Sequence, residues 1–124
     1  ILLASKKKIK SIYTRLCLYT SKNPLSSSWK SLKSNPVVDS SILGRNAGLI
    51  KESYKNIYRI SQAQLPGNYG AFISINKILN ISKRNFFEKR IKNILPSHDK
   101  HIEGIHTLNY AKNFTVFDCS KWKK

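Results

Sequence analysis

The stretch 79-LNISKRNFFEKRIKN-93 decides which fold is expected for this chain. Its apolar residues recur at intervals that favour one face of a helix, and they are Phe86, Phe87, Ile91 and, just beyond the stretch, Ile94. Cations stand at positions 83, 84, 89, 90 and 92, with Glu88 as the one acid among them. The stretch therefore predicts either one basic amphipathic helix or a turn followed by a second helix.

A helix is also expected upstream, over residues 49–62. The pattern places two sets of side chains on different sides of that helix: Ile50, Tyr54, Ile57 and Tyr58 on one side, and Lys51, Lys55 and Arg59 on another. The segment LPGNYG at 65–70 should end the helix, because Pro66 and Gly67 break regular structure.

The next helical region is expected over residues 71–95 and includes the opening stretch. Pro96 should end it, because proline lacks the N–H that a helix needs. Farther along, Phe114 and Val116 alternate with Thr115 and Phe117, and this alternation predicts a short strand near the C-terminus. The expected fold class is therefore mainly α: a small helical domain with a long basic N-terminal extension and a short C-terminal strand.

Residues 1–38 are expected to form that extension, because they contain no acid and many cations. Residues 8–20 have helical periodicity, and Pro24 and Pro36 interrupt the chain after them. Asp39 or Ser40 can cap a short first turn, so the folded part should begin near Asp39. The expected organisation is a basic extended arm over 1–38, part of it helical, and a small helical RNA-binding domain with a basic tail over 39–124.

The charge of the chain indicates a polyanionic partner. The 124 residues include 23 Lys or Arg and 6 Asp or Glu, which gives a formal net charge of +17. Solvated surfaces normally mix both signs, so this excess favours contact with phosphate groups. Ile, Leu, Val and Phe exceed the roughly one-fifth share that is typical of disordered chains, so a folded core is expected. A bound polyanion should stabilise that core against self-repulsion.

The opening stretch resembles the second half of the helix-turn-helix motif. In that resemblance residues 80–82 form the turn, and Lys83, Arg84 and Asn85 begin a helix that reads base edges in the major groove. Two positions depart from the family pattern: Asn80 stands where Gly is usual, and Asn76 stands where a small Ala is usual. The resemblance implies a DNA-binding protein, which is the alternative to RNA binding.

In composition and layout the whole chain resembles organellar ribosomal proteins, which are small and strongly basic and carry acid-free extensions. Residues 1–38 also resemble a mitochondrial targeting segment in composition. The ribosomal resemblance implies a structural constituent of the ribosome in the mitochondrial matrix, which binds ribosomal RNA through phosphate contacts and touches neighbouring ribosomal proteins. Aromatic side chains beside cations would stack on unpaired bases. The residues expected to contact RNA are Lys6, Lys7, Lys8, Lys10, Arg15, Lys51, Lys55, Arg59, Lys77, Lys83, Arg84, Lys89, Arg90, Lys92, Lys121, Trp122, Lys123 and Lys124.

Other classes of function receive less support. No GxSxG, P-loop or HExxH motif is present, so no enzyme, small-molecule substrate or cofactor is expected. His98, His101 and His106 with Cys119 match no closed zinc spacing, so no metal is expected. Cys17 and Cys119 are expected to be free thiols, with one disulfide as the alternative. No apolar run approaches the roughly 18 residues of a membrane span, so an integral membrane protein is not expected, whereas a peripheral subunit on anionic lipid stays open.

Overall fold

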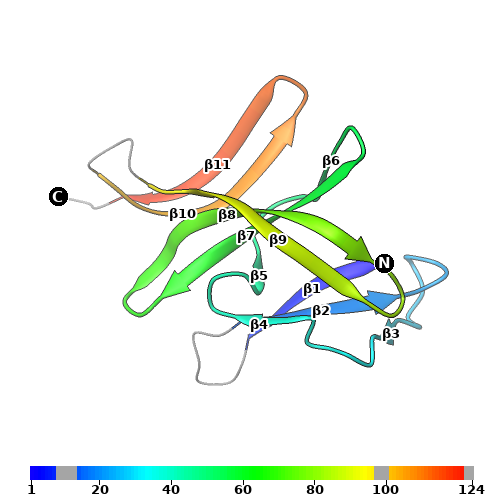
Figure 1. Ribbon diagram of the computed structural model, residues 1–124. Coiled ribbons are helices and arrows are strands. Elements are labelled where there is room, and N and C mark those ends of the chain that lie inside the picture. The colour runs from blue at the N-terminus through cyan, green and yellow to red at the C-terminus, as the bar shows by residue number, and fades with distance from the viewer. Residues whose placement is uncertain (8–13, 97–100, 122–124) are drawn as a thin grey trace.

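The computed structural model describes residues 1–7, 14–96 and 101–121, and these residues form strands and no helix (Figure 1). The strands are β1 (Leu2–Lys7), β2 (Thr14–Thr20), β3 (Lys30–Ser31), β4 (Val38–Ser40), β5 (Arg45–Asn46), β6 (Lys51–Ser53), β7 (Asn56–Leu65), β8 (Asn68–Ile81), β9 (Phe86–Ile94), β10 (Ile102–Ala111) and β11 (Phe114–Lys121). The mainly α prediction is therefore wrong, whereas the strand predicted from Phe114 and Val116 is confirmed as part of β11.

Sheet B, made of β5 to β9, is the centre of the fold. Its strands follow the order β5-β7-β8-β9, and β6 also pairs with β7. β7 and β8 are joined by a tight turn of Pro66 and Gly67, which lets Leu65 pair with Asn68. Gly67 has a φ of +70°, a left-handed conformation that glycine adopts without steric cost. The LPGNYG segment is thus a hairpin turn and not the end of a helix.

Sheet A, made of β1 to β4, covers one face of sheet B. β2 pairs antiparallel with β1, β3 and β4. Leu16 and Leu18 of β2 are fully buried and pack with Ile78 and Phe86 of sheet B, and Figure 1 shows sheet A below sheet B. Strands β1 to β4, within the residues expected to form an extended arm, are therefore part of the folded domain, and β2 contributes Leu16 and Leu18 to its core. The helix expected over 8–20 is wrong for residues 14–20, which form β2, and residues 8–13 lie outside the described part.

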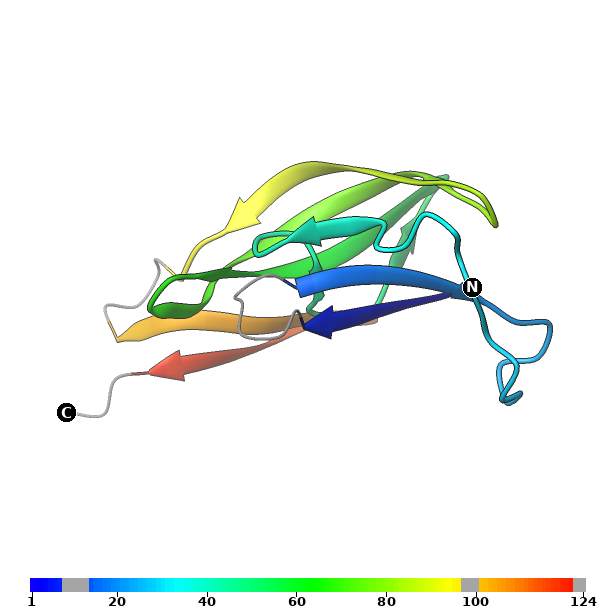
Figure 2. The same cartoon turned by 90° about the horizontal axis from the view of Figure 1, so that it is seen from below.

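Sheet C, the β10–β11 hairpin, covers part of the opposite face (Figure 1). Ile105 and Leu108 of β10 pack on Ile60 and Ile73 of sheet B. The backbone N–H of Leu108 also donates to the carbonyl oxygen of Ala47 at 2.8 Å. Figure 2 shows β9 on the far side of the molecule from β1 and β11, and among the described strands β9 pairs only with β8, so it forms an edge of sheet B.

The two central helices predicted from the sequence are replaced by strands for one physical reason. Residues 49–62 contain β6 and most of β7, and residues 71–95 contain most of β8, a turn and β9. Sheets A and C cover the two faces of sheet B, so the side chains of β7 are buried whether they project to one face or to the other. Residues 59–63 are consequently all buried, one after another. A strand buried on both faces lacks the alternation that identifies a strand in sequence.

The turn between β8 and β9 also replaces the recognition helix. Ser82 Oγ accepts hydrogen bonds from the backbone N–H groups of Arg84 and Asn85, and the Ser82 N–H donates to the Asn85 carbonyl at 2.9 Å. Lys83 and Arg84 therefore stand at the tip of a hairpin. The helix-turn-helix interpretation of residues 79–93 is wrong, because neither of its helices exists.

Candidate nucleic-acid interface

Three lysines and one tyrosine form a row across sheet B. Lys51 of β6 pairs with Tyr58 of β7. Tyr58 pairs in turn with Lys77 of β8, and Lys77 pairs with Lys89 of β9. Residues directly opposite each other in antiparallel strands project to the same side of the sheet. The strand register therefore brings together four side chains that are scattered over almost forty positions of sequence.

The same face of sheet B continues along β9. Phe87 lies two residues before Lys89, so it shares that face, and it is 62% exposed. Lys92 pairs with Ile75, which lies two residues before Lys77 and thus on the same side. We call this surface the lysine face and define it as Lys51, Tyr58, Lys77, Phe87, Lys89 and Lys92. Tyr58 and Lys77 are half-buried, and the other four residues of the lysine face are exposed.

A hollow of about 300 Å³ adjoins the lysine face where it meets β10. Its lining includes Lys51, Ser53, Tyr58 and Tyr110. The Lys51 ammonium lies 4.1 Å from the centre of the Tyr110 ring, a cation–π contact that holds the charge at the mouth of the hollow. Aromatic rings beside a positioned cation have the chemistry to stack a base and to neutralise its phosphate.

The carboxylates near this surface point elsewhere. Glu88 precedes Lys89 but projects to the opposite face of sheet B, where it pairs with Arg59. Among the described residues, Lys77 and Lys89 have no carboxylate partner. Like charges directly opposite each other destabilise a strand pair, so the row costs stability in the free protein. An anion bound along the row would remove that cost.

Arg59 is among the residues expected to contact nucleic acid, and the structure corrects that prediction. Its side chain is 1% exposed, and its Nε donates to a Glu88 oxygen at 2.8 Å. The remaining donors reach Asn46 Oδ1 at 3.0 Å and the Leu43 carbonyl at 2.7 Å. Arg59 of β7 thus connects β5, the residues just before β5, and β9 inside the protein. The sequence pattern groups Arg59 with Lys51 and Lys55 on one side of an expected helix, and that grouping does not indicate a buried ion pair.

The other expected contact residues lie in several places. Arg15 on sheet A pairs with Asp39 at 3.3 Å, and Arg90 projects from β9 on the side opposite the lysine face. Lys6 and Lys121 are on sheets A and C, far from one another in topology. The other exposed members stand in turns, and they are Lys55, Lys83 and Arg84. Lys7 lies in β1, and the remaining members lie outside the described residues: Lys8, Lys10, Trp122, Lys123 and Lys124.

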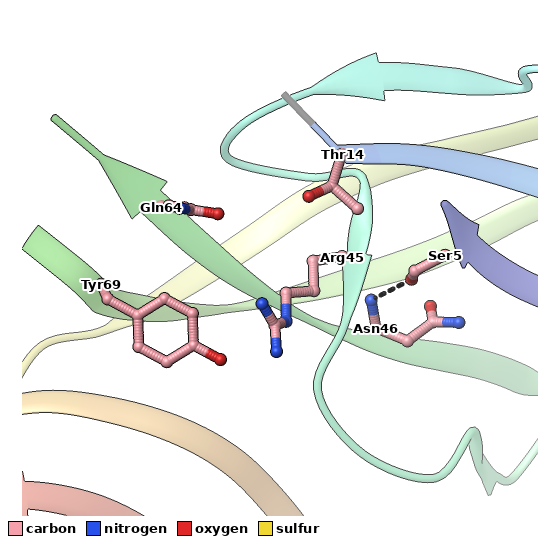
Figure 3. Close-up of a pocket in the computed structure, with 6 residues that line it drawn as sticks. All are labelled: Ser5, Thr14, Arg45, Asn46, Gln64 and Tyr69. Atoms are coloured by element: carbon pink, nitrogen blue, oxygen red, sulfur yellow. Dashed lines mark hydrogen bonds between the residues drawn. The ribbon is translucent and has the colours of Figure 1, made fainter. Parts of the chain in front are cut away.

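A second hollow, of about 530 Å³, lies where sheet A meets sheet B (Figure 3). The Arg45 guanidinium sits over the Tyr69 ring, 4.9 Å from its centre. Ser5 Oγ accepts from the backbone N–H of Asn46 and donates to the Gly44 carbonyl, so Ser5 is part of the wall. Figure 3 shows the Gln64 amide directed toward the middle of this hollow. Arg45, Tyr69 and Gln64 together offer a cation and hydrogen-bonding groups, and no motif in the sequence connects them.

Metal, membrane and disulfide features are absent from the described part of the chain. Within residues 1–7, 14–96 and 101–121, no group of three or more His, Cys, Asp or Glu side chains could hold a metal ion. The same ranges contain no helix long and apolar enough to cross a membrane. Cys17 is buried and Cys119 is half-buried, and both are free thiols.

The lysine face combines uncompensated cations with the exposed ring of Phe87 and the half-buried ring of Tyr58 on a β-sheet, and cations beside aromatic rings are the features that sheet surfaces use to bind unpaired nucleotides. No protein-family model, curated protein or solved structure matches this chain. Its function is therefore inferred from the geometry of the lysine face and from the charge of the chain.

Proposed function

We propose that this chain binds ribosomal RNA as a structural component of a mitochondrial ribosome, and that the lysine face is its principal RNA contact. The observation that carries the proposal is the row of Lys51, Lys77 and Lys89, which has no carboxylate beside it among the described residues. The net charge of +17 supports the same class of partner.

The chemistry of the lysine face favours unpaired RNA over the base edges of a DNA duplex. Bases in a DNA groove are read by hydrogen bonds to their edges, mainly from Arg, Lys, Asn and Gln side chains. The lysine face carries no Arg, Asn or Gln, and its feature that favours unpaired RNA is the exposed ring of Phe87, which can stack on a splayed base while the lysines neutralise phosphate. Such contacts are tolerant of sequence, as expected of a protein that holds RNA in place.

Neighbouring ribosomal proteins are proposed as further partners, and β11 supports this. Phe114, Val116 and Phe117 are 72%, 60% and 53% exposed. Among the described strands, β11 pairs only with β10, so it forms an edge of sheet C. An apolar strand edge of this kind is suited to pairing with a strand from an adjacent protein.

The RNA contact can be tested with a double substitution, Lys77→Gln with Lys89→Gln. Salt-dependent binding to a single-stranded RNA should weaken similarly for unrelated sequences, and the slope of log K against log salt should fall by roughly 0.7 for each phosphate that the protein no longer neutralises. The matched control is Lys33→Gln with Lys112→Gln, which removes the same charge from exposed turns. The first pair should also leave the fold at least as stable, because it removes a like-charge strand pair.

Equal losses of affinity in both doubly substituted proteins would contradict the assignment of RNA binding to the lysine face. The ribosomal part of the proposal needs a separate measurement, in which the tagged native protein is sedimented from an organelle lysate at low and moderate salt. Co-migration with a ribosomal subunit that disappears after nuclease treatment is the expected result. Migration as a small species in every condition would contradict it.

A further inference from the structure

A third hollow, of about 610 Å³, lies between the loop after β2 and the tip of the β8–β9 hairpin. Lys22, Lys30 and Lys83 line it, together with Ser, Thr and Asn side chains from residues 20–28. Lys22 and Lys30 belong to sheet A and its loop, whereas Lys83 belongs to a turn of sheet B. The fold thus places Lys83 in the same hollow as Lys22 and Lys30, from which it is separated by more than fifty positions of sequence. No acidic residue lines the hollow.

The walls of this hollow are fixed by their own hydrogen bonds. The Asn23 N–H donates to Ser21 Oγ, and Asn23 Oδ1 accepts from the Leu25 N–H at 2.9 Å. Lys30 is held by the pairing of β3 with β2. Lys83 is held by the turn that Ser82 closes. The three lysine backbones are therefore positioned before any ligand arrives, which reduces the ordering cost of binding.

Three ammonium groups around one hollow repel each other and offer only donors. Ser21 Oγ already donates to the Asn23 carbonyl, and Ser26 and Ser28 share one hydrogen bond, so Thr20 and one of these two serines can add hydroxyl donors. A single carboxylate or a neutral base would leave most of this charge uncompensated, whereas neighbouring phosphate groups would match it. We propose that this hollow binds two or more closely spaced phosphate groups, supplied either by a sharp bend of an RNA backbone or by a free polyphosphate.

This inference does not need the lysine face to bind RNA. Where RNA is the source of the phosphates, the hollow adds a second contact to the proposed function, because Lys83 stands at the tip of the same hairpin that carries Phe87 and Lys89. A strand of RNA lying along β9 would then reach the hollow at the point where the hairpin turns.

Inorganic tripolyphosphate is the first probe, with lysine acylation on the full chain read by mass spectrometry. At roughly ten times its Kd the probe should slow acylation of Lys22, Lys30 and Lys83 by about tenfold, in proportion to occupancy. Lys33 and Lys112 lie in exposed turns outside the hollow and should react at an unchanged rate. Equal protection of all five lysines, or of none, would overturn the inference.

A set of variants provides the second readout. The triple change Lys22→Gln, Lys30→Gln and Lys83→Gln should abolish the rise in Tm that tripolyphosphate gives to the native protein. The control triple Lys33→Gln, Lys55→Gln and Lys112→Gln removes the same charge and should keep that rise. All six lysines are exposed, so both proteins should fold. The same absence of a Tm response in both would contradict a defined site.

A third arm separates the two sources of phosphate and the two proposals. A single-stranded RNA and a tightly bent hairpin RNA are each tested for protection of the hollow and of Lys77 and Lys89. Protection of the hollow by bent RNA supports an RNA ligand, and protection by tripolyphosphate alone supports a free polyphosphate. Protection of the hollow without Lys77 and Lys89 would refute the lysine face and retain the hollow. If every probe protects only Lys77 and Lys89, the phosphate site in the hollow is refuted and the lysine face is retained.

Discussion

Replacing Glu88 with Ala should cause one of the largest losses of stability that a single substitution in the edge strand β9 can produce. Glu88 and Arg59 have side chains that are 5% and 1% exposed, so their ion pair is almost completely shielded from water. In the Glu88→Ala protein, Arg59 would keep only the neutral acceptors of Asn46 and Leu43. A buried guanidinium would then lack a counter-charge.

The size of the effect follows from that geometry. Removing one partner of a buried ion pair costs about 3–5 kcal/mol, which is a large part of the roughly 5–15 kcal/mol that stabilises a typical domain. Replacing both partners, with Arg59→Met and Glu88→Leu, should cost less, because no charge stays buried. The acceptors on Asn46 and Leu43 would lose their donor, so a loss of about 1–3 kcal/mol is expected for the double variant.

Urea unfolding followed by circular dichroism measures both values, with Glu52→Ala as the control. Glu52 is exposed and makes no ion pair within the described residues, so its replacement should change stability by less than about 0.5 kcal/mol. A Glu88→Ala protein as stable as the Glu52→Ala protein would refute the burial of Arg59. It would also return Arg59 to the set of RNA contacts, because a solvated guanidinium at that position would be free to meet phosphate.

Two further predictions concern backbone packing and the thiols. Gly44→Ala should destabilise strongly in urea unfolding, because the added Cβ would lie 1.7 Å from the Thr14 carbonyl oxygen, whereas Gly67→Ala should cost only about 1 kcal/mol because it meets no atom and is disfavoured by φ alone. Cys119 should react with a thiol reagent in the native protein, while Cys17, which is 7% exposed, should react only after unfolding; equal rates would contradict the burial of β2.

The fold could not be read from the sequence because sheet B is covered on both sides. β7 places Ile60 toward sheet C and Arg59 toward sheet A, and both are buried. Because a charged residue and an apolar residue are buried next to each other, the alternation of polar and apolar residues that marks a strand is lost. The spacing of Ile50, Tyr54 and Ile57 then matches a helix by coincidence. The signal that is present is local: Pro66 and Gly67 form a two-residue break, and the run after them contains Ile73, Ile75 and Ile78, which is typical of a strand that follows a hairpin turn.

The candidate site is predictable in composition but not in arrangement. Lys51, Lys77 and Lys89 belong to both the expected set of contacts and the lysine face, yet sequence spacing groups them as stripes on two helices. Their actual row depends on strand register, which sequence spacing does not reveal. The same helical spacing places Tyr58 on an apolar side, away from the cations. The sequence places Lys22 in the expected extended arm. Its position beside Lys83 depends on how sheet A packs on sheet B, and sequence spacing does not reveal that packing.

Alternation along β9 separates the residues that hold the fold from those available to a ligand. Phe86 and Glu88 project toward sheet A and are engaged in the core and in the ion pair with Arg59, whereas Phe87 and Lys89 project to the open face. Because Glu88 is directed inward, the nearest negative charge in the sequence cannot offset Lys77 and Lys89. The uncompensated charge of the lysine face is therefore a consequence of how the core is built. Substitutions at 86 and 88 should consequently reduce stability, whereas those at 87 and 89 should reduce affinity for RNA while stability is maintained.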